Sequence, residues 1–80
     1  MDETTLYSLT DIEDALVETT LDEVYSALVE RGFNPVNQIV GYLTTVDASY
    51  ITYNKDARNK ILSIDRGKLI ETIVRKYLEG

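Results

Sequence analysis

The fold of this 80-residue chain is decided by a junction between two helices, residues 31–43, which read Arg31-Gly32-Phe33-Asn34-Pro35-Val36-Asn37-Gln38-Ile39-Val40-Gly41-Tyr42-Leu43. Arg31 and Gly32 end the first helix, because a basic side chain suits a helix C-terminus and glycine takes the left-handed conformation that follows it. Asn34 and Pro35 begin the second helix, since asparagine caps helices well and proline is tolerated at the first helical position. Gly41 costs that helix about 1 kcal/mol relative to alanine, which indicates that another helix approaches closely there.

Upstream of the junction, the sequence predicts one helix with a defined start. Thr20 and Glu23 form the S/T-x-x-E arrangement, in which each side chain binds the other's backbone N–H. Apolar residues follow at helical spacing: Leu21, Val24, Tyr25, Leu28 and Val29. Residues 1–19 have fewer apolar anchors, so we expect a disordered acidic segment with a short, weak helix from about Thr10 to Glu18. The chain therefore divides into this flexible segment and a helical core domain, residues 20–80.

Downstream of the junction, polar capping residues divide the chain into further helices. The second helix runs from Pro35 to about Leu43. Residues 44–53 are rich in Thr, Tyr and β-branched residues, but a lone strand would leave its backbone groups unpaired, so we expect Asp47 to cap a single helical turn instead. Asn54 caps a third main helix and Asp65 caps the last. The predicted fold class is all-α, a small domain of about four to five helices.

Charge is distributed unevenly along the chain. Residues 1–30 contain nine acidic and no basic residues, whereas residues 31–80 contain all eight basic residues and five acidic ones. The simpler interpretation is that the two halves lie against each other in the folded protein. The alternative is that the acidic first half is a regulated segment, whose affinity for a basic surface changes when charge is added.

The composition excludes several chemistries. The chain has no Cys and no His, so it has no Cys/His zinc site, no thiol nucleophile and no imidazole base. Its carboxylates are best explained as solvated faces, and we expect no catalytic residues, no metal site and no cofactor. No apolar run approaches the ~18 residues that span a membrane, and Met1 is followed by acidic residues rather than a basic signal segment. We therefore expect a cytoplasmic, non-enzymatic protein that does not insert into membranes.

Two helices joined by a short turn also raise the hypothesis of a helix-turn-helix that binds DNA. A recognition helix needs basic or amide side chains that reach phosphates and base edges. The second helix offers only Asn37 and Gln38, and it follows a strongly acidic helix. The sequence therefore argues against nucleic-acid binding. We expect these two amides to cap a helix, to bridge helices or to contact a protein partner.

The run from Gly32 to Leu43 closely resembles GYNPINQIVGYL, the signature of the IreB family of regulatory phosphoproteins from Gram-positive bacteria. Further matching segments stand in the same order over about residues 20–79: Val24 to Leu28, Tyr50-Ile51, Asp56-Ala57-Arg58-Asn59 and Ile70 to Leu78. The resemblance marks eleven residues as a family signature and candidate interface: Gly32, Asn34, Pro35, Asn37, Gln38, Ile39, Gly41, Tyr42, Asp56, Arg58 and Asn59.

The resemblance also implies a function. Members of the family are small helical homodimers and substrates of a transmembrane Ser/Thr kinase with extracellular PASTA repeats. Their phosphorylation on N-terminal threonines is linked to control of the cell-envelope stress response and to cephalosporin resistance. The implied partners are a second copy of the chain, the kinase and its phosphatase, and an unidentified downstream protein. We expect the dimer to use the apolar surfaces of the Pro35–Leu43 helix and of the C-terminal helix.

The family's phosphoacceptor motif can be placed on this chain. Asp2-Glu3-Thr4 matches the family's D-E-T, so Thr4 is the matching phosphoacceptor. The family's second threonine falls on Met1, and Thr5 is the nearest substitute by adjacency. The chain also departs from the family where G-D-P and I-P-R are replaced by Val46-Asp47-Ala48 and Ile51-Thr52-Tyr53. The alternative function is a constitutive helical interaction module without phospho-regulation.

Overall fold

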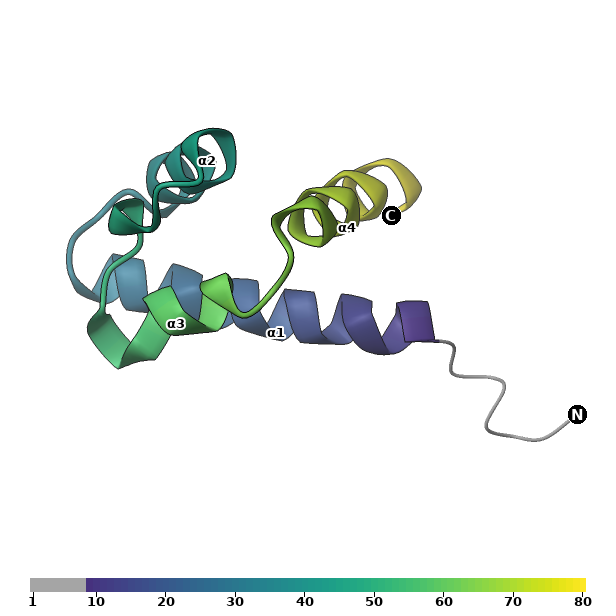
Figure 1. The fold of residues 1–80 in the computed structure, drawn as a ribbon, viewed down its shortest axis with the longest axis horizontal. Helices are drawn as coiled ribbons and strands as arrows, with labels where there is room; N and C mark the ends of the chain where they lie inside the picture. The colour runs from purple at the N-terminus through teal and green to yellow at the C-terminus, as the bar shows by residue number, and fades with distance from the viewer. Residues whose placement is uncertain (1–8) are drawn as a thin grey trace, which may run out of the picture.

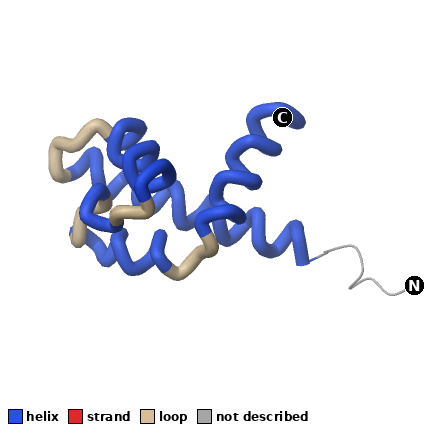
Figure 2. The backbone as a smooth tube through the Cα atoms, turned by 45° about the horizontal axis from the view of Figure 1, so that its top comes forward, coloured by secondary structure: helices blue, strands red, loops and turns tan. Residues whose placement is uncertain are grey.

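The computed structural model describes residues 9–80 and shows an all-α fold (Figure 1). Its elements in chain order are α1 (Leu9–Glu30), α2 (Pro35–Thr45), the short 3₁₀ helices η2 (Ala48–Tyr50) and η3 (Asn54–Asp56), α3 (Ala57–Leu62) and α4 (Arg66–Glu79). No strand occurs within this part of the chain (Figure 2). The predicted fold class is therefore confirmed, with four α-helices.

The long first helix differs from the sequence prediction. α1 is one continuous helix of 22 residues, so the predicted helix start at Thr20 is wrong, and Thr20 is buried in the middle of the helix. No glycine or proline interrupts residues 9–30, so the helix continues upstream of the S/T-x-x-E arrangement. The inward face of its first half carries Asp14 and Val17, while Leu9, Ile12 and Leu16 are exposed. The predicted disorder of residues 1–8 lies outside the described residues.

The junction between α1 and α2 confirms the prediction. Gly32 has φ +82°, and its N–H donates to the Val29 carbonyl (2.9 Å). Phe33 N–H donates to the Leu28 carbonyl (3.0 Å), which completes a left-handed C-terminal cap. Asn34 Oδ1 then accepts a hydrogen bond from Asn37 N–H (3.0 Å) and starts α2. These caps reverse the chain and lay α2 back against the end of α1 (Figure 1).

The segment between α2 and α3 is helical but irregular. Asp47 caps η2 as predicted, and its carboxylate accepts a hydrogen bond from Ser49 N–H (3.0 Å). The predicted cap at Asn54 is wrong: α3 begins only at Ala57, after two residues in the left-handed region, Lys55 and Asp56. The side-chain amide of Asn54 instead donates to the Ala27 carbonyl (3.1 Å) at the end of α1.

The core lies along α1, which every other α-helix contacts (Figure 1). α2 and α3 pack on its C-terminal half, and α4 crosses its N-terminal half. The buried apolar residues are Val17, Val24, Ala27, Leu28, Tyr42, Ile51, Ala57, Ile61, Ile64 and Leu69. Asp65 caps α4 as predicted, because its carboxylate accepts from Lys68 N–H (3.0 Å). The predicted apolar stripe of α4 mostly faces outward: Ile70, Ile73, Val74, Tyr77 and Leu78 are all exposed.

Candidate functional site

The first group of signature residues lies where α2 packs against η2. Gln38 Nε2 donates a hydrogen bond to the Tyr50 carbonyl (2.8 Å). Gly41 lies directly beneath the Tyr50 ring, because a Cβ atom at Gly41 would lie 2.5 Å from two ring carbons. This confirms the close approach that the glycine predicted. Tyr42, on the next face of α2, is buried in the core. Gln38 and Gly41 therefore fix how η2 packs on α2, and Tyr42 anchors α2 in the core.

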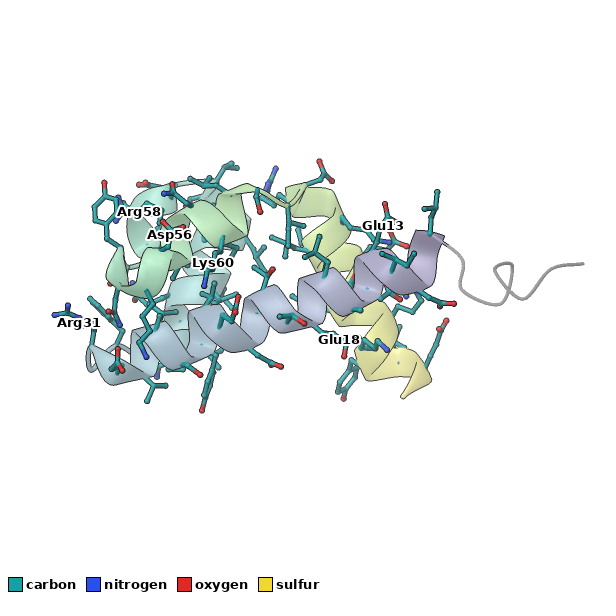
Figure 3. All side chains as sticks on the ribbon, turned by 90° about the horizontal axis from the view of Figure 1, so that it is seen from below. Glu13, Glu18, Arg31, Asp56, Arg58 and Lys60 are labelled. Carbon is teal, nitrogen blue, oxygen red and sulfur yellow. The ribbon has the colours of Figure 1, made fainter. Side chains whose placement is uncertain are left out.

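The second group lies on η3 and α3. Arg58 Nε donates to the Ile51 carbonyl (2.7 Å), and its guanidinium lies 3.6 Å from the centroid of the Tyr53 ring. Asn59 Nδ2 donates to Asp56 Oδ1 (2.8 Å). Lys60, also on α3, lies 3.5 Å from Glu23 of α1. Figure 3 shows Asp56, at the end of η3, close to Arg58 on α3, and both lie far from Glu13 near the start of α1.

The signature therefore divides into residues that hold the fold and residues that face outward. Gln38, Gly41, Tyr42 and Arg58 make internal contacts. Ile39 is half-buried against the core, and Pro35 is half-buried at the start of α2. The exposed members are Gly32, Asn34, Asn37, Asp56 and Asn59. This exposed subset offers the most surface to a partner, and the half-buried members offer part of theirs.

Apolar side chains extend the exposed subset into a larger surface. Val36 and Val40 stand one helical turn apart on the outward face of α2, and Val36 is 65% exposed. Phe33, in the junction that precedes them, is also exposed. Exposed apolar side chains that follow one another on a helix face are typical of an interaction surface. We call Phe33, Val36 and Val40 the α2 face.

A polar cluster that the sequence did not reveal joins α1 to α4. Asp14 is buried, with 8% of the residue exposed, and its carboxylate accepts hydrogen bonds from Arg75 Nη1 and Nη2 and from Thr72 Oγ1 (3.3 Å). Lys68 Nζ lies 3.6 Å from Asp14 Oδ1. The hydrogen bonds from Arg75 hold the pKa of Asp14 below the usual range of an aspartate, and the Asp14 carboxylate in turn raises the pKa of Arg75. The sequence offers one signal for Asp14, its position three residues before the apolar Val17, which places both on one face of a helix.

Along most of the length of α1, ion pairs connect this helix to the basic second half of the chain. Glu18 pairs with Lys76 (3.2 Å), Glu23 with Lys60 (3.5 Å) and Glu30 with Lys55 (3.0 Å). With the Asp14 cluster, these contacts confirm the interpretation that the acidic and basic halves lie against each other. Glu30 also accepts a hydrogen bond from Asn54 Nδ2 (2.7 Å). That hydrogen bond and the Lys55 ammonium lower the pKa of Glu30.

The remaining predictions concern chemistry and the phosphoacceptors. Residues 9–80 contain no group of three or more acidic side chains arranged to hold a metal ion. None of the helices described is both long and apolar enough to cross a membrane. Thr4 and Thr5, the predicted phosphorylation sites, lie outside the described residues.

One comparison with known proteins bears on this arrangement. The model of a protein family described as IreB regulatory phosphoprotein matches residues 2–79 of the chain. The match includes the Asp2-Glu3-Thr4 motif, all of α1, and both groups of signature residues. It spans nearly the entire sequence rather than the signature run alone. The chain belongs to the IreB family of regulatory phosphoproteins.

Proposed function

We propose that this regulatory phosphoprotein is a non-enzymatic, cytoplasmic substrate of a transmembrane Ser/Thr kinase of the PASTA type, with Thr4 as its phosphoacceptor. Through this phosphorylation it controls the cell-envelope stress response and cephalosporin resistance. The observation that carries the proposal is the family match over residues 2–79, which includes Asp2-Glu3-Thr4. Thr5 is the second acceptor if two are used.

The ion pairs within the fold support the proposal that a phosphate on Thr4 is recognised by a partner protein. A phosphate on Thr4 would carry about −1.5 to −2 charges. Lys55, Lys60, Lys68, Arg75 and Lys76 each lie within 4.0 Å of an α1 carboxylate. Because these five of the eight cations already pair with carboxylates, recognition of the phosphate by another protein is favoured. A protein phosphatase and one downstream protein complete the proposed set of partners.

In vitro phosphorylation tests the site. The purified chain is incubated with the cognate kinase, and phosphate is mapped by mass spectrometry in the wild type and in Thr4→Ala, Thr5→Ala and Thr19→Ala variants. We expect Thr4→Ala to remove most of the phosphate. Thr19 is exposed on α1 and serves as the control, so Thr19→Ala should leave phosphorylation unchanged. Phosphate confined to residues beyond 20 would contradict the assignment of Thr4.

We also propose that the chain acts as a homodimer. The exposed apolar side chains on α2 and α4, the two helices expected to form the interface, support this proposal: Val36, Val40, Ile70, Ile73, Val74, Tyr77 and Leu78. Sedimentation equilibrium should show a mass that rises from monomer to dimer with concentration. A Val36→Asp/Val40→Asp variant should weaken association without unfolding α2, because both side chains are exposed. A monomer mass at all concentrations would contradict the dimer.

The α2 face favours one alternative, a constitutive interaction module. Its apolar side chains are exposed in the unmodified chain, so a partner could bind them without phosphorylation. Under this alternative, Thr4→Ala and Thr4→Glu strains would resist cephalosporin as the wild type does. Under the main proposal, the two variants shift resistance in opposite directions. Pull-downs with phosphorylated and unmodified chain would then show which form the downstream protein binds.

A further inference from the structure

The contact between α1 and α4 differs in chemistry from the rest of the core. Glu13, Asp14 and Glu18 on α1 face three cations on α4, which are Lys68, Arg75 and Lys76. Glu71 on α4 lies 3.1 Å from Arg75 and 4.0 Å from Lys68. Charged groups therefore make several of the contacts between α4 and α1, in addition to the buried Leu69, whereas α3 buries two apolar residues, Ala57 and Ile61, and makes one ion pair to α1, between Lys60 and Glu23.

α4 also covers the face of α1 on which it packs only in part. Only Leu69 and Thr72 are buried among its residues. An open groove of about 440 Å³ on one side of the crossing is lined by Leu21 and Asp22 of α1 and by Ile73 of α4. A second groove, of about 370 Å³, is lined by Leu16 and Val17 of α1, among others. The face of α1 beneath α4 therefore keeps free space on both sides of the helix that occupies it.

The residues of α1 at this contact define what chemistry the face accepts. Val17 is buried there and Leu21 is half-buried, so the face has an apolar strip. Carboxylates border that strip at Glu13, Asp14 and Glu18. A helix that fits needs an apolar side chain to pack on the strip and basic side chains one or two turns apart to pair with the carboxylates. α4 meets these requirements with Leu69 and with three of its four cations, Lys68, Arg75 and Lys76.

We propose that the α4-binding face of α1 is a docking surface for a basic amphipathic helix of a partner protein, and that α4 occupies this surface in the free chain. α4 thereby acts as an intramolecular competitor. Displacement of α4 exposes Leu69 to the same partner, because Leu69 is buried in the free chain, whereas Tyr77 and Leu78 are exposed in either state. The proposal concerns α1 and α4 alone, so it can fail or succeed independently of phosphorylation at Thr4.

A peptide with the sequence of residues 65–80 is the probe, because this segment forms α4, which occupies the face in the structure. Its binding to the full chain is measured by fluorescence anisotropy. Arg75→Glu in the chain repels its own α4 from Asp14, and should tighten peptide binding about tenfold or more, since a competitor that occupies the site reduces apparent affinity by the fraction of free sites. Lys55→Glu is the matched control, because Lys55 forms an ion pair with Glu30 at the other end of α1. It should leave binding unchanged.

Charge reversal tests whether the peptide uses the proposed face. An Asp14→Lys chain should bind a peptide that carries Arg75→Glu and should not bind the wild-type peptide. Equal binding of both peptides, or no saturable binding to a folded Arg75→Glu chain, would overturn the proposal. Circular dichroism establishes that each variant is folded.

If the Arg75→Glu variant does not fold, hydrogen exchange of the wild-type chain tests the same proposal. The proposal requires that α4 amides exchange through a local opening separate from the unfolding of α3. Because the contact is ionic, raising the salt concentration from about 0.05 to 0.5 M should speed that opening several-fold. Exchange of α4 and α3 with the same protection and the same salt response would overturn the proposal.

Discussion

Arg75 donates hydrogen bonds from Nη1 and Nη2 to the carboxylate of Asp14, a residue that lies 61 positions earlier in the chain. This two-point contact joins the first α-helix to the last. Thr72 Oγ1 adds a third hydrogen bond to the same carboxylate (3.3 Å). The carboxylate is largely removed from water and yet charged, so its stability depends on these donors. The position of α4 therefore depends on the ionisation of Asp14.

We predict that acid destabilises the protein through its paired carboxylates. Hydrogen bonds from Arg75 lower the folded-state pKa of Asp14, and hydrogen bonds from Asn54 and Lys55 lower that of Glu30. The stabilisation is therefore complete above the unfolded-state pKa of about 4. It is lost as the pH falls through the lower folded-state values. Urea denaturation should give a nearly constant free energy of unfolding from pH 7 to about 5 and a steep fall below about pH 4.

Asp14→Asn checks the origin of this pH dependence. The amide keeps the shape of the side chain but cannot ionise, so the variant should be less stable at pH 7 and less sensitive to acid. Asp22→Asn is the control, because Asp22 is exposed on α1. An Asp14→Asn protein that loses stability in acid as steeply as the wild type would contradict the assignment.

Gly41→Ala should destabilise the protein because of Tyr50. The new methyl group would lie 2.5 Å from ring carbons, so the ring must move away from α2. We expect a net loss of about 1–2 kcal/mol, since overpacking outweighs the roughly 1 kcal/mol that alanine gains over glycine in a helix. In a Tyr50→Ala background the sign should reverse, and Gly41→Ala should stabilise. Urea denaturation of the four proteins in this cycle measures both effects.

Arg58 should contribute to stability as well as to any interface. Lysine cannot reproduce the Nε hydrogen bond to the Ile51 carbonyl or the flat contact with the Tyr53 ring. We expect Arg58→Lys to cost about 1 kcal/mol and Tyr53→Ala about 0.5 kcal/mol. The double variant should cost less than the sum, because the two side chains act as a pair. Strictly additive losses would show that the ring contact contributes nothing.

Helix ends could be predicted from the sequence where a local device sets them. Gly32, Asn34, Asp47 and Asp65 each act within three or four residues of their own position, and each does what the sequence predicts. The start of α1 could not be predicted in this way. Thr20 and Glu23 form a valid capping arrangement, but a helix that meets no breaker upstream gains hydrogen bonds by continuing.

In the candidate site, too, the sequence predicted features set by neighbouring residues and missed contacts between residues far apart in the chain. Gly41 predicted a close approach because glycine inside a helix is otherwise unfavourable, although it did not identify Tyr50 as the neighbour. Asp14 and Arg75 could not be paired from the sequence, since nothing local connects residues so far apart. Asn54 was misread because a capping residue and a residue that bonds a distant carbonyl look identical in sequence, and here the Ala27 carbonyl is its acceptor.

Leu69 and Val74 should differ sharply when each is replaced by alanine. Leu69 is fully buried where α4 meets the core, so Leu69→Ala should cost about 2–5 kcal/mol at any protein concentration. Val74 is exposed on the outer side of the same helix, so Val74→Ala should change the stability of the monomer by less than about 0.5 kcal/mol. If α4 forms part of a homodimer interface, the cost of Val74→Ala rises when thermal unfolding is repeated at roughly 100-fold higher concentration, because association stabilises only the wild type fully. A cost that stays near zero at both concentrations would exclude Val74 from the interface.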